Sequence, residues 1–496
     1  MKLTGSYMLN SPHSTLLCDI AAHALTTPDK IALVEGDVRI SYAQFASRIL
    51  ACASFMQSLG LQAGDRVLLS AQKEQEFIYA YFAAHLLGVV NVVVDSAAPR
   101  ERLDYIVSVV KPTFCFSNGE GHDACRNIPF SQIPLDDSTV EQLQLPRLQA
   151  TDVADVMFTT GTTGAPKGVC LSHANISASA SNTNGFIGTN ADDVEALALP
   201  LSHSFGLGRL RCVLSVGATL VLVSNFANLK SFFTVLDQER VTGFGMVPAA
   251  WQYIKRFSGR RIARFADRLR YIEIGSAAMP TEDKHLLMEL FPTTRLCMHY
   301  GLTEASRALF CEFHADAANL ASVGRPASPL VEVQVIGEDG KHLDDGIDGE
   351  LCVSGNMVCR SYFLASDNEG AFYGNWFRTG DWGHRDEQGN FYLTGRKKEL
   401  INVGGEKVSP AAIEEAIMSL GVKDCACVAV SDPNGVLGEV PKAYLVKGDT
   451  PIDVDELKSR LVQLLPQHEI PVQWEWIDQI PRTPSGKIQR MKLKQS

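Results

Sequence analysis

The sequence predicts an α/β protein. It has a large N-terminal domain of layered α/β sheets that includes a β-rich subdomain, and a small α+β C-terminal domain. The chain of 496 residues is too long for one hydrophobic core. Helical and strand-like patterns alternate up to about Val331, which is typical of mostly parallel sheets covered by helices. Beyond that point the pattern changes to short strands separated by turns.

Apolar segments mark the helices and strands of the alternating part. Early in the chain a helix, a strand and a helix that starts at a proline are expected at Glu76–Leu87, Val89–Val94 and Pro99–Val110. The alternation returns later as helix, strand, helix and strand at Leu229–Arg240, Gly243–Val247, Lys284–Leu290 and Arg295–His299.

The last third of the chain has a different pattern. Short strands are expected at Val331–Ile336, Gly349–Ser354 and Asn390–Thr394, with a turn at Gly337–Gly340. After Gly395, helices are expected near Pro410–Ser419 and Val454–Leu465, and strands near Cys425–Val430 and Lys442–Val446. We therefore assign residues 1–397 to the large domain and 398–496 to the small one, a plausible domain size.

The composition excludes several classes of protein. The net charge of −11 argues against general nucleic-acid binding, which favours a basic surface. No apolar run approaches the roughly 20 residues of a membrane span, and the first residues lack the core of a signal peptide. The twelve cysteines show no metal-ligand spacing, and Cys425 and Cys427 are expected to pack on one face of a strand. We expect a cytoplasmic protein with reduced thiols.

The most informative segment is Phe158–Gly168, with the sequence FTTGTTGAPKG. It follows a short apolar strand, Val153–Phe158. Glycines let several backbone N–H groups point at one anion, threonine hydroxyls add donors, and Lys167 supplies a full charge. The segment is therefore suited to holding a polyphosphate, although its spacing differs from that of the common P-loop.

Five further segments have a composition typical of functional sites. In chain order they are Leu199–Gly206 (LPLSHSFG), Gly275–Pro280 (GSAAMP), His299–Glu304 (HYGLTE), Phe377–Asp381 (FRTGD) with Gly395–Ile401 (GRKKELI), and Pro481–Arg490 (PRTPSGKIQR). With the phosphate loop, they resemble the acyl-adenylate-forming superfamily over nearly the whole chain. This superfamily includes acyl-CoA synthetases, aryl-CoA ligases, peptide-synthetase adenylation domains and beetle luciferase. The pattern is closest to the acyl- and aryl-CoA ligases.

The resemblance implies that ATP and a carboxylic acid form an acyl-AMP with loss of pyrophosphate. Negative charge builds up on the phosphate, so preorganised cations and N–H donors are the main requirement. Glu304 is the expected Mg²⁺ ligand and Thr303 a donor to the α-phosphate. The β- and γ-phosphates would be held by Thr159, Thr160, Gly161, Thr162, Thr163, Gly164 and Lys167.

The resemblance also assigns the rest of the nucleotide. Asp381 would accept the ribose hydroxyls, and Arg396 would support the sugar or the phosphate. The adenine would lie between two short segments of mainly small residues: Ser276, Ala277 and Ala278, and His299, Tyr300, Gly301 and Leu302.

The C-terminal domain carries the remaining implied roles. Lys487 resembles the catalytic lysine, whose ammonium bridges the carboxylate and the α-phosphate. Lys398 resembles the hinge about which the small domain swings between two half-reactions. Gly404 and Gly405 follow on a loop that lines the thiol tunnel in relatives.

The acyl pocket is predicted from the same resemblance. Its expected wall is His203, Phe205, Met246, Val247, Gly275 and Gly301. No aspartate stands beside Phe205, which disfavours an α-amino-acid substrate. Arg209 and Arg307 lie close to these segments in the sequence. Each is either a partner for a second carboxylate or a polar substituent on the acid or, more often for such arginines, a structural residue of the surface.

The acyl acceptor stays open at this stage. Coenzyme A is the leading expectation, and the alternatives are the phosphopantetheine of a carrier protein or an amine. A nucleotide-binding scaffold without turnover is disfavoured because Lys167, Glu304, Asp381, Arg396 and Lys487 are all present. An oxygenase like luciferase is the weakest alternative.

Overall fold

The computed structural model describes residues 16–119, 121–134, 143–159, 165–448, 453–482 and 488–494. The loop residues 160–164 and Lys487 therefore lie outside the described residues. The chain forms two compact units. The first contains the chain up to Thr159, Pro166–Glu332 and Val353–Phe377, and the second contains Val333–Cys352 and the chain from Arg378 onward.

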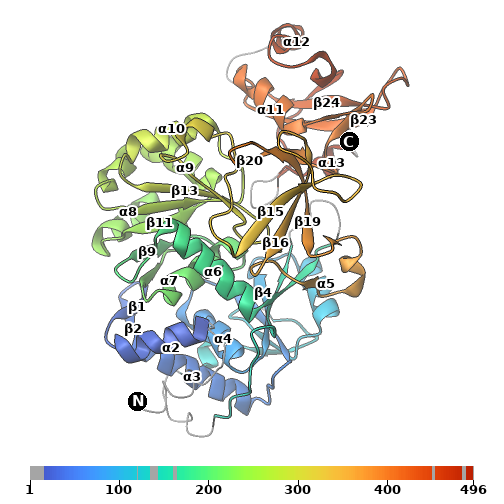
Figure 1. Cartoon of the computed structure of the whole chain (residues 1–496). Coiled ribbons are helices and arrows are strands. Elements are labelled where there is room, and N and C mark those ends of the chain that lie inside the picture. The colour runs from blue at the N-terminus through green and yellow to red at the C-terminus, as the bar shows by residue number, and fades with distance from the viewer. Residues whose placement is uncertain are drawn as a thin grey trace. The chain divides into compact units, whose positions relative to one another are not determined.

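The first unit contains an eight-stranded sheet with the order β14-β13-β12-β11-β9-β10-β1-β2, parallel except at its two outer pairs. Its strands are β1 (Ile31–Glu35), β2 (Val38–Ser41), β9 (Val194–Leu197), β10 (Thr219–Leu222), β11 (Gly243–Met246), β12 (Tyr271–Ile274), β13 (Arg295–Tyr300) and β14 (Leu309–Glu312). Helices α8 (Leu229–Gln238), α9 (Pro248–Ser258) and α10 (Thr281–Leu290) lie beside it (Figure 1). Their apolar faces form a large buried core with the strands.

A seven-stranded sheet in the same unit has the order β17-β8-β7-β4-β3-β5-β6, and its pairs from β7 to β6 are parallel. Its strands are β3 (Arg66–Ala71), β4 (Val90–Asp95), β5 (Phe114–Phe116), β6 (Arg126–Ile128), β7 (Val153–Phe158), β8 (Gly168–Ser172) and β17 (Ser361–Tyr362). Helices α4 (Gln75–Leu86), α5 (Arg100–Val110) and α6 (His173–Ile187) pack against this sheet. Helix α3 (Tyr42–Ser58) packs against α4 and against β1 and β2 of the eight-stranded sheet, and α2 (Leu16–Thr26) packs against α3 and α7 (Ser204–Ser215). The expectation of layered, mostly parallel sheets is confirmed.

Helix α7 (Ser204–Ser215) is tied to both of these sheets by buried arginines. Arg209 pairs with Glu195 on β9, and Arg211 pairs with Asp155 on β7. Residues two apart on a helix point about 200° apart, so the two guanidinium groups leave on opposite sides. Burial alone would raise the pKa of Asp155, but Arg211 and His85 outweigh it and lower the pKa to about 2.

We expect Asp155→Asn to lower the free energy of unfolding by about 3–5 kcal/mol, because it leaves the Arg211 charge buried without a counter-charge. The urea midpoint, followed by circular dichroism, measures this loss. The double variant Asp155→Asn/Arg211→Met removes both charges and should recover much of it. An unchanged midpoint in the single variant would contradict the prediction.

The remaining strands and helices form the β-rich and C-terminal parts. A five-stranded sheet contains β15 (Val331–Ile336), β16 (Gly349–Gly355), β18 (Phe372–Tyr373), β19 (Trp376–Arg385) and β20 (Phe391–Arg396). The later elements are β21 (Ile401–Val403), β22 (Glu406–Val408), α11 (Pro410–Ser419), β23 (Asp424–Ser431), β24 (Glu439–Val446), α12 (Val454–Leu461), β25 (Gln473–Trp476) and α13 (Arg490–Lys494). Short 3₁₀ turns occur at Phe130–Gln132, Arg261–Phe265, Ala317–Asn319, Ala365–Asn368 and Gln467–Glu469.

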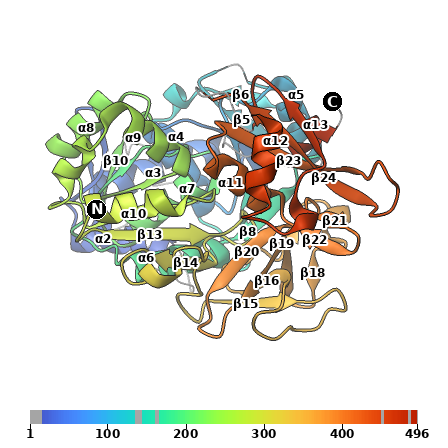
Figure 2. The same ribbon diagram turned by 90° about the horizontal axis from the view of Figure 1, so that it is seen from above.

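A separate apolar core lies within the C-terminal part. Helices α11 and α12 lie beside strands β23 and β24 (Figure 2). Cys425 and Cys427 are both buried in this core, so their expected packing role is confirmed. All twelve cysteines of the chain are free thiols. In the part of the chain that the structure describes, no helix combines the length and apolar character that crossing a membrane requires.

Candidate active site

The base of the phosphate loop is the antiparallel hairpin of β7 and β8. The Thr159 N–H donates to the Lys167 carbonyl at 3.0 Å, and the Lys167 N–H donates to Thr159 Oγ1 at 3.2 Å. Arg102 Nη2 donates to the Thr159 carbonyl at 2.9 Å. The two ends of the loop are therefore fixed by backbone pairing, while its five central residues are outside the described part.

The Lys167 side chain is held close to strand β17. Its Nζ lies 3.6 Å from Asp367 Oδ1 and 5.0 Å from the centre of the Tyr362 ring. Tyr362 pairs with Val169 across β17 and β8, which brings its ring next to the hairpin. The Lys167 side chain is 45% exposed, so an incoming anion can reach it. A half-exposed ion pair of this kind contributes little to stability.

Glu304 lies at the other end of the same tyrosine. The Tyr362 hydroxyl donates to Glu304 Oε1 at 2.7 Å, and the Glu304 carbonyl accepts from the Cys359 N–H at 2.8 Å. Burial and the nearby Glu304 carboxylate raise the pKa of Tyr362, so the phenol keeps its proton. Two of the predicted residues, Lys167 and Glu304, are thus brought together by Tyr362, which was not predicted from the sequence. The only sequence signal for Tyr362 is a tyrosine hydroxyl in a short strand.

The two segments expected to flank the adenine follow neighbouring parallel strands. Strand β12 leads into Ser276, Ala277 and Ala278, which are exposed, and β13 ends at His299 and Tyr300. Ile274 is in register with Met298, so both segments leave the same edge of the sheet. Ser276 has a positive φ of 74°, which turns the chain sharply after β12. Gly301, Leu302 and Thr303 continue from β13 towards the buried Glu304.

Two of the predicted acyl-pocket residues, Phe205 and Gly275, lie against His299, which was predicted to flank the adenine. The rings of Phe205 and His299 are perpendicular, with centres 4.7 Å apart. A β-carbon at Gly275 would overlap the His299 ring, so only glycine fits there. Met246 is buried, and Val247 is partly exposed after β11. His203 is partly exposed at the residue that precedes α7.

Arg209 and Arg307 are fully buried, so the interpretation of either as a surface residue is wrong. Arg307 Nε donates to Glu273 Oε1 at 2.7 Å, and Arg209 Nη1 lies 3.2 Å from Glu273 Oε2. Burial alone would raise the pKa of Glu273, but Arg307 and Arg209 lower it below its ordinary value. Glu273 and Glu195 were not predicted from the sequence. The signal that could have identified each of them is a carboxylate within an otherwise apolar strand.

In the second unit, Asp381 and Arg396 lie opposite each other on β19 and β20. Arg396 Nε lies 2.8 Å from Asp381 Oδ1, and Arg396 Nη1 donates to the Thr379 carbonyl at 3.1 Å. Gly380 adopts φ 73°, which shapes the turn before Asp381. The carboxylate is therefore buried, and Arg396 fixes its orientation.

We expect Asp381→Asn to raise the KM for ATP more than it lowers kcat, because ribose hydroxyls are bound both before and during the reaction. The loss of a hydrogen bond to a charged group corresponds to roughly 1.5–3 kcal/mol, or about 10- to 100-fold in kcat/KM. Pyrophosphate release at varied ATP measures it. A variant with unchanged KM would show that Asp381 does not bind the nucleotide.

Three further predicted residues of the second unit that the structure describes, Lys398, Gly404 and Gly405, are exposed. Lys398 is exposed just after β20. Gly404 and Gly405 form the turn of the β21–β22 hairpin, with φ 61° and 101°. The Gly404 N–H donates to the Leu437 carbonyl at 2.9 Å, and the Gly405 N–H donates to Asn402 Oδ1 at 3.1 Å. Two consecutive positive φ angles explain the glycine pair.

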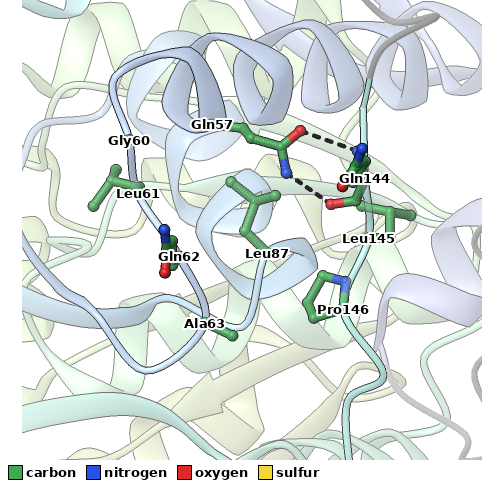
Figure 3. Close-up of a pocket in the computed structure, with 9 residues that line it drawn as sticks. All are labelled: Gln57, Gly60, Leu61, Gln62, Ala63, Leu87, Gln144, Leu145 and Pro146. Carbon is green, nitrogen blue, oxygen red and sulfur yellow. Dashed lines mark hydrogen bonds between the residues drawn. The ribbon is translucent and has the colours of Figure 1, made fainter.

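A pocket of about 440 Å³ in the first unit contains none of the predicted site residues (Figure 3). The Gln57 side chain spans one side of it, with two hydrogen bonds to the backbone of Gln144. None of the described residues that line it has a charged side chain. Its lining is Gln57, Gly60, Leu61, Gln62, Ala63, Leu87, Gln144, Leu145 and Pro146. It lacks the groups that acid activation needs.

The residues present fit a magnesium ion held mainly by its substrate. Mg²⁺ usually binds through one or two carboxylates plus substrate phosphates, with no cage made by protein alone. Among the described residues, no group of three or more His, Cys, Asp or Glu side chains is placed to hold a metal. Glu304 therefore suits the role of a single carboxylate ligand beside bound phosphates.

A nucleotide-dependent enzyme that activates an acid accounts for this arrangement. The chain belongs to the AMP-binding enzyme family, whose model matches residues 20–363, and the AMP-binding enzyme C-terminal domain matches residues 412–487. The acyl-adenylate-forming superfamily and the AMP-forming acid–thiol ligase class expected from the sequence are thereby confirmed.

Comparison with known proteins shows that this chain is similar to CoA ligases. The chain is 28% identical to a 2-succinylbenzoate–CoA ligase of Bacillus licheniformis, covering 94% of this chain and 97% of the relative. It is 29% identical to a feruloyl-CoA synthase of an Amycolatopsis species, covering 94% and 95%. A solved o-succinylbenzoate CoA synthetase of Bacillus subtilis, in complex with ATP and a magnesium ion, has 27% identity and a TM-score of 0.87 over 96% of this chain and 99% of that one.

Proposed function

We propose that the enzyme makes an acyl-CoA from a small carboxylic acid in two steps. The acid oxygen attacks the α-phosphorus of ATP, which gives acyl-AMP and pyrophosphate. The CoA thiol then attacks the acyl carbon, which gives the thioester, AMP and a proton. The observation that supports this most is the Lys167–Tyr362–Glu304 array at the base of the phosphate loop, in a chain whose relatives are named CoA ligases.

The first step needs cations and donors aimed at the phosphates. We assign the polyphosphate to Lys167 and the loop it closes, and the Mg²⁺ ion to Glu304. Lys167 is presently shared between Asp367 and Tyr362, so it is pre-positioned and can turn to an anion at small cost. Asp381 and Arg396 are proposed to hold the ribose. Lys487 is proposed to neutralise the charge that builds up as the acyl–phosphate bond forms.

The second step is proposed to follow a swing of the small domain about Lys398. We place the boundary between residues 397 and 398 for that reason, and the thiol tunnel beside Gly404 and Gly405. The cytoplasm is the proposed compartment, where the twelve free thiols of the chain stay reduced. The acceptor is CoA in this proposal, and a carrier-protein thiol or an amine are the alternatives.

An acceptor assay with the purified full-length enzyme tests the function. Pyrophosphate release is measured over a panel of small monocarboxylic acids, with ATP and Mg²⁺. The best acid is then adenylated on the enzyme, and CoA, a holo-carrier protein and simple amines are supplied in separate reactions. We expect CoA to release AMP at a rate that matches pyrophosphate formation. Consumption of carrier protein or amine, but not CoA, would overturn the proposed acceptor.

A further inference from the structure

A cluster of buried charges lies directly against the predicted acyl-binding residues. Arg209, Arg307, Glu195 and Glu273 have side chains that are at most 1% exposed. The Arg307 guanidinium lies 5.2 Å from the centre of the Phe205 ring, and its Nη2 donates to the Phe205 carbonyl at 3.2 Å. This charged cluster therefore packs on one face of Phe205.

The cluster and its neighbours occupy the space beside three glycines. A β-carbon at Gly208 would overlap the Arg307 guanidinium, and one at Gly301 would overlap the Arg307 backbone. At Gly275 the same space is taken by the His299 ring. The small residues of the predicted wall thus accommodate other parts of the protein. At these glycines, the space that a larger side chain would need is taken by Arg307 and His299.

The two positive charges of the cluster are matched by its own two negative charges. Arg209 bonds to Glu195 through Nε at 2.8 Å and also contacts Glu273, while Arg307 bonds to Glu273. Two guanidinium groups therefore face two carboxylates. Burial lowers the pKa of His299, which keeps its ring neutral beside Glu273. Within this cluster of described residues, both guanidinium charges are therefore matched by carboxylates of the protein.

We infer that this charged cluster closes the acyl end of the site and restricts the enzyme to compact monocarboxylic acids. The non-reacting end of such an acid is uncharged and stops against Phe205 and His299. The substrate class is a short aliphatic or single-ring acid. This inference rests on the proposed acid activation and adds to it the identity of the specificity-determining residues, Arg307 and Glu273.

Pyrophosphate release by the wild-type enzyme gives the first test. The straight-chain acids from propanoate to dodecanoate, together with benzoate, are compared by kcat/KM. We expect a maximum among the shorter acids or benzoate, then a fall of roughly tenfold or more for each methylene beyond it. Succinate and glutarate should be at least tenfold poorer than butanoate and pentanoate. A maximum at decanoate or dodecanoate, or a preference for the dicarboxylates, would overturn the inference.

The variant Glu273→Gln/Arg307→Gly gives the second test. It removes one charge of each sign, and glycine suits position 307 because Arg307 has φ 61°. We expect the kcat/KM maximum to move to acids that are longer by two or three methylenes than the acid that the wild type prefers. The ratio of kcat/KM for these longer acids to kcat/KM for that acid should rise about tenfold. An unshifted profile in a folded variant would overturn the assignment of these residues.

A matched control comes from the other side of helix α7. Asp155→Asn/Arg211→Met also removes one buried charge of each sign, but neither residue contacts Phe205 or His299 in any interaction described above. It should alter stability and leave the length profile unshifted. If both double variants shift the profile equally, the effect is a general loosening and the inference fails. Absence of pyrophosphate release with every acid would instead refute the proposed function itself.

Discussion

Replacing Glu304 with glutamine should lower the rate of adenylate formation by about 10²–10³-fold, a cost of roughly 3–4 kcal/mol. Glutamine keeps the shape of the side chain, but it has no negative charge and is a poor ligand for a hard divalent cation. We therefore expect the loss to be partly offset at high Mg²⁺ concentration. Pyrophosphate release at varied Mg²⁺ with saturating ATP and acid measures both effects.

Tyr362→Phe is the matched comparison for this prediction. It leaves the Glu304 carboxylate in place and deletes only the hydroxyl that donates to it at 2.7 Å. Loss of one hydrogen bond to a charged group corresponds to about 1.5–3 kcal/mol, so the reduction should not exceed about 100-fold. A Glu304→Gln enzyme with a normal rate, or one less affected than Tyr362→Phe, would contradict the assignment of Glu304.

Lys487→Ala should collapse adenylate formation by about 10²–10³-fold, while thioester formation from supplied acyl-AMP is largely spared. The physical reason is that, in the proposed mechanism, the ammonium offsets charge only while the acyl–phosphate bond forms. The two half-reactions are measured separately, as pyrophosphate release and as acyl-CoA formation from synthetic acyl-AMP. Equal losses in both would show that one conformation serves both steps.

Lys398→Pro provides the reciprocal variant. Proline fixes φ near −65°, so it stiffens the proposed pivot without touching the phosphate groups. We expect adenylation to persist and thioester formation to fall. The pair of variants therefore separates a defect in charge stabilisation from a defect in domain motion.

The helices and strands were predictable because apolar residues recur at regular intervals along the chain. Helix α11 was predicted with the bounds that the structure gives, and α4, α5 and α8 differ from their predicted ends by one or two residues. Short helices and strands were harder to bound: α12 ends at Leu461, earlier than the predicted Leu465. Helix ends depend on local capping and tertiary contacts, which the apolar pattern does not encode.

The site was predictable only where its residues stand in local motifs. Lys167 belongs to a segment whose composition is informative by itself, whereas Glu304 and Asp381 were predicted because their segments resemble motifs of the superfamily. Tyr362 stands 58 residues from Glu304, and their contact depends on a bridge between Ala305 and Val358 that no local pattern reveals. Arg209 and Arg307 were recognised as unusual, but their burial follows from carboxylates on β9 and β12 that lie far away in the sequence.

The two arginines of α7 have a consequence for how such an enzyme can acquire a new substrate. Arg209 and Arg211 anchor one helix to two different sheets, so a mutation at either position strands a carboxylate in the interior. Of the two, only Arg209 belongs to the charged cluster beside Phe205, so a route to a wider pocket there must pass through a paired exchange, or through an intermediate stabilised elsewhere in the protein. Libraries of single substitutions at these two arginines should yield mostly unfolded variants. Functional variants should come mainly from double substitutions that keep the buried charges matched.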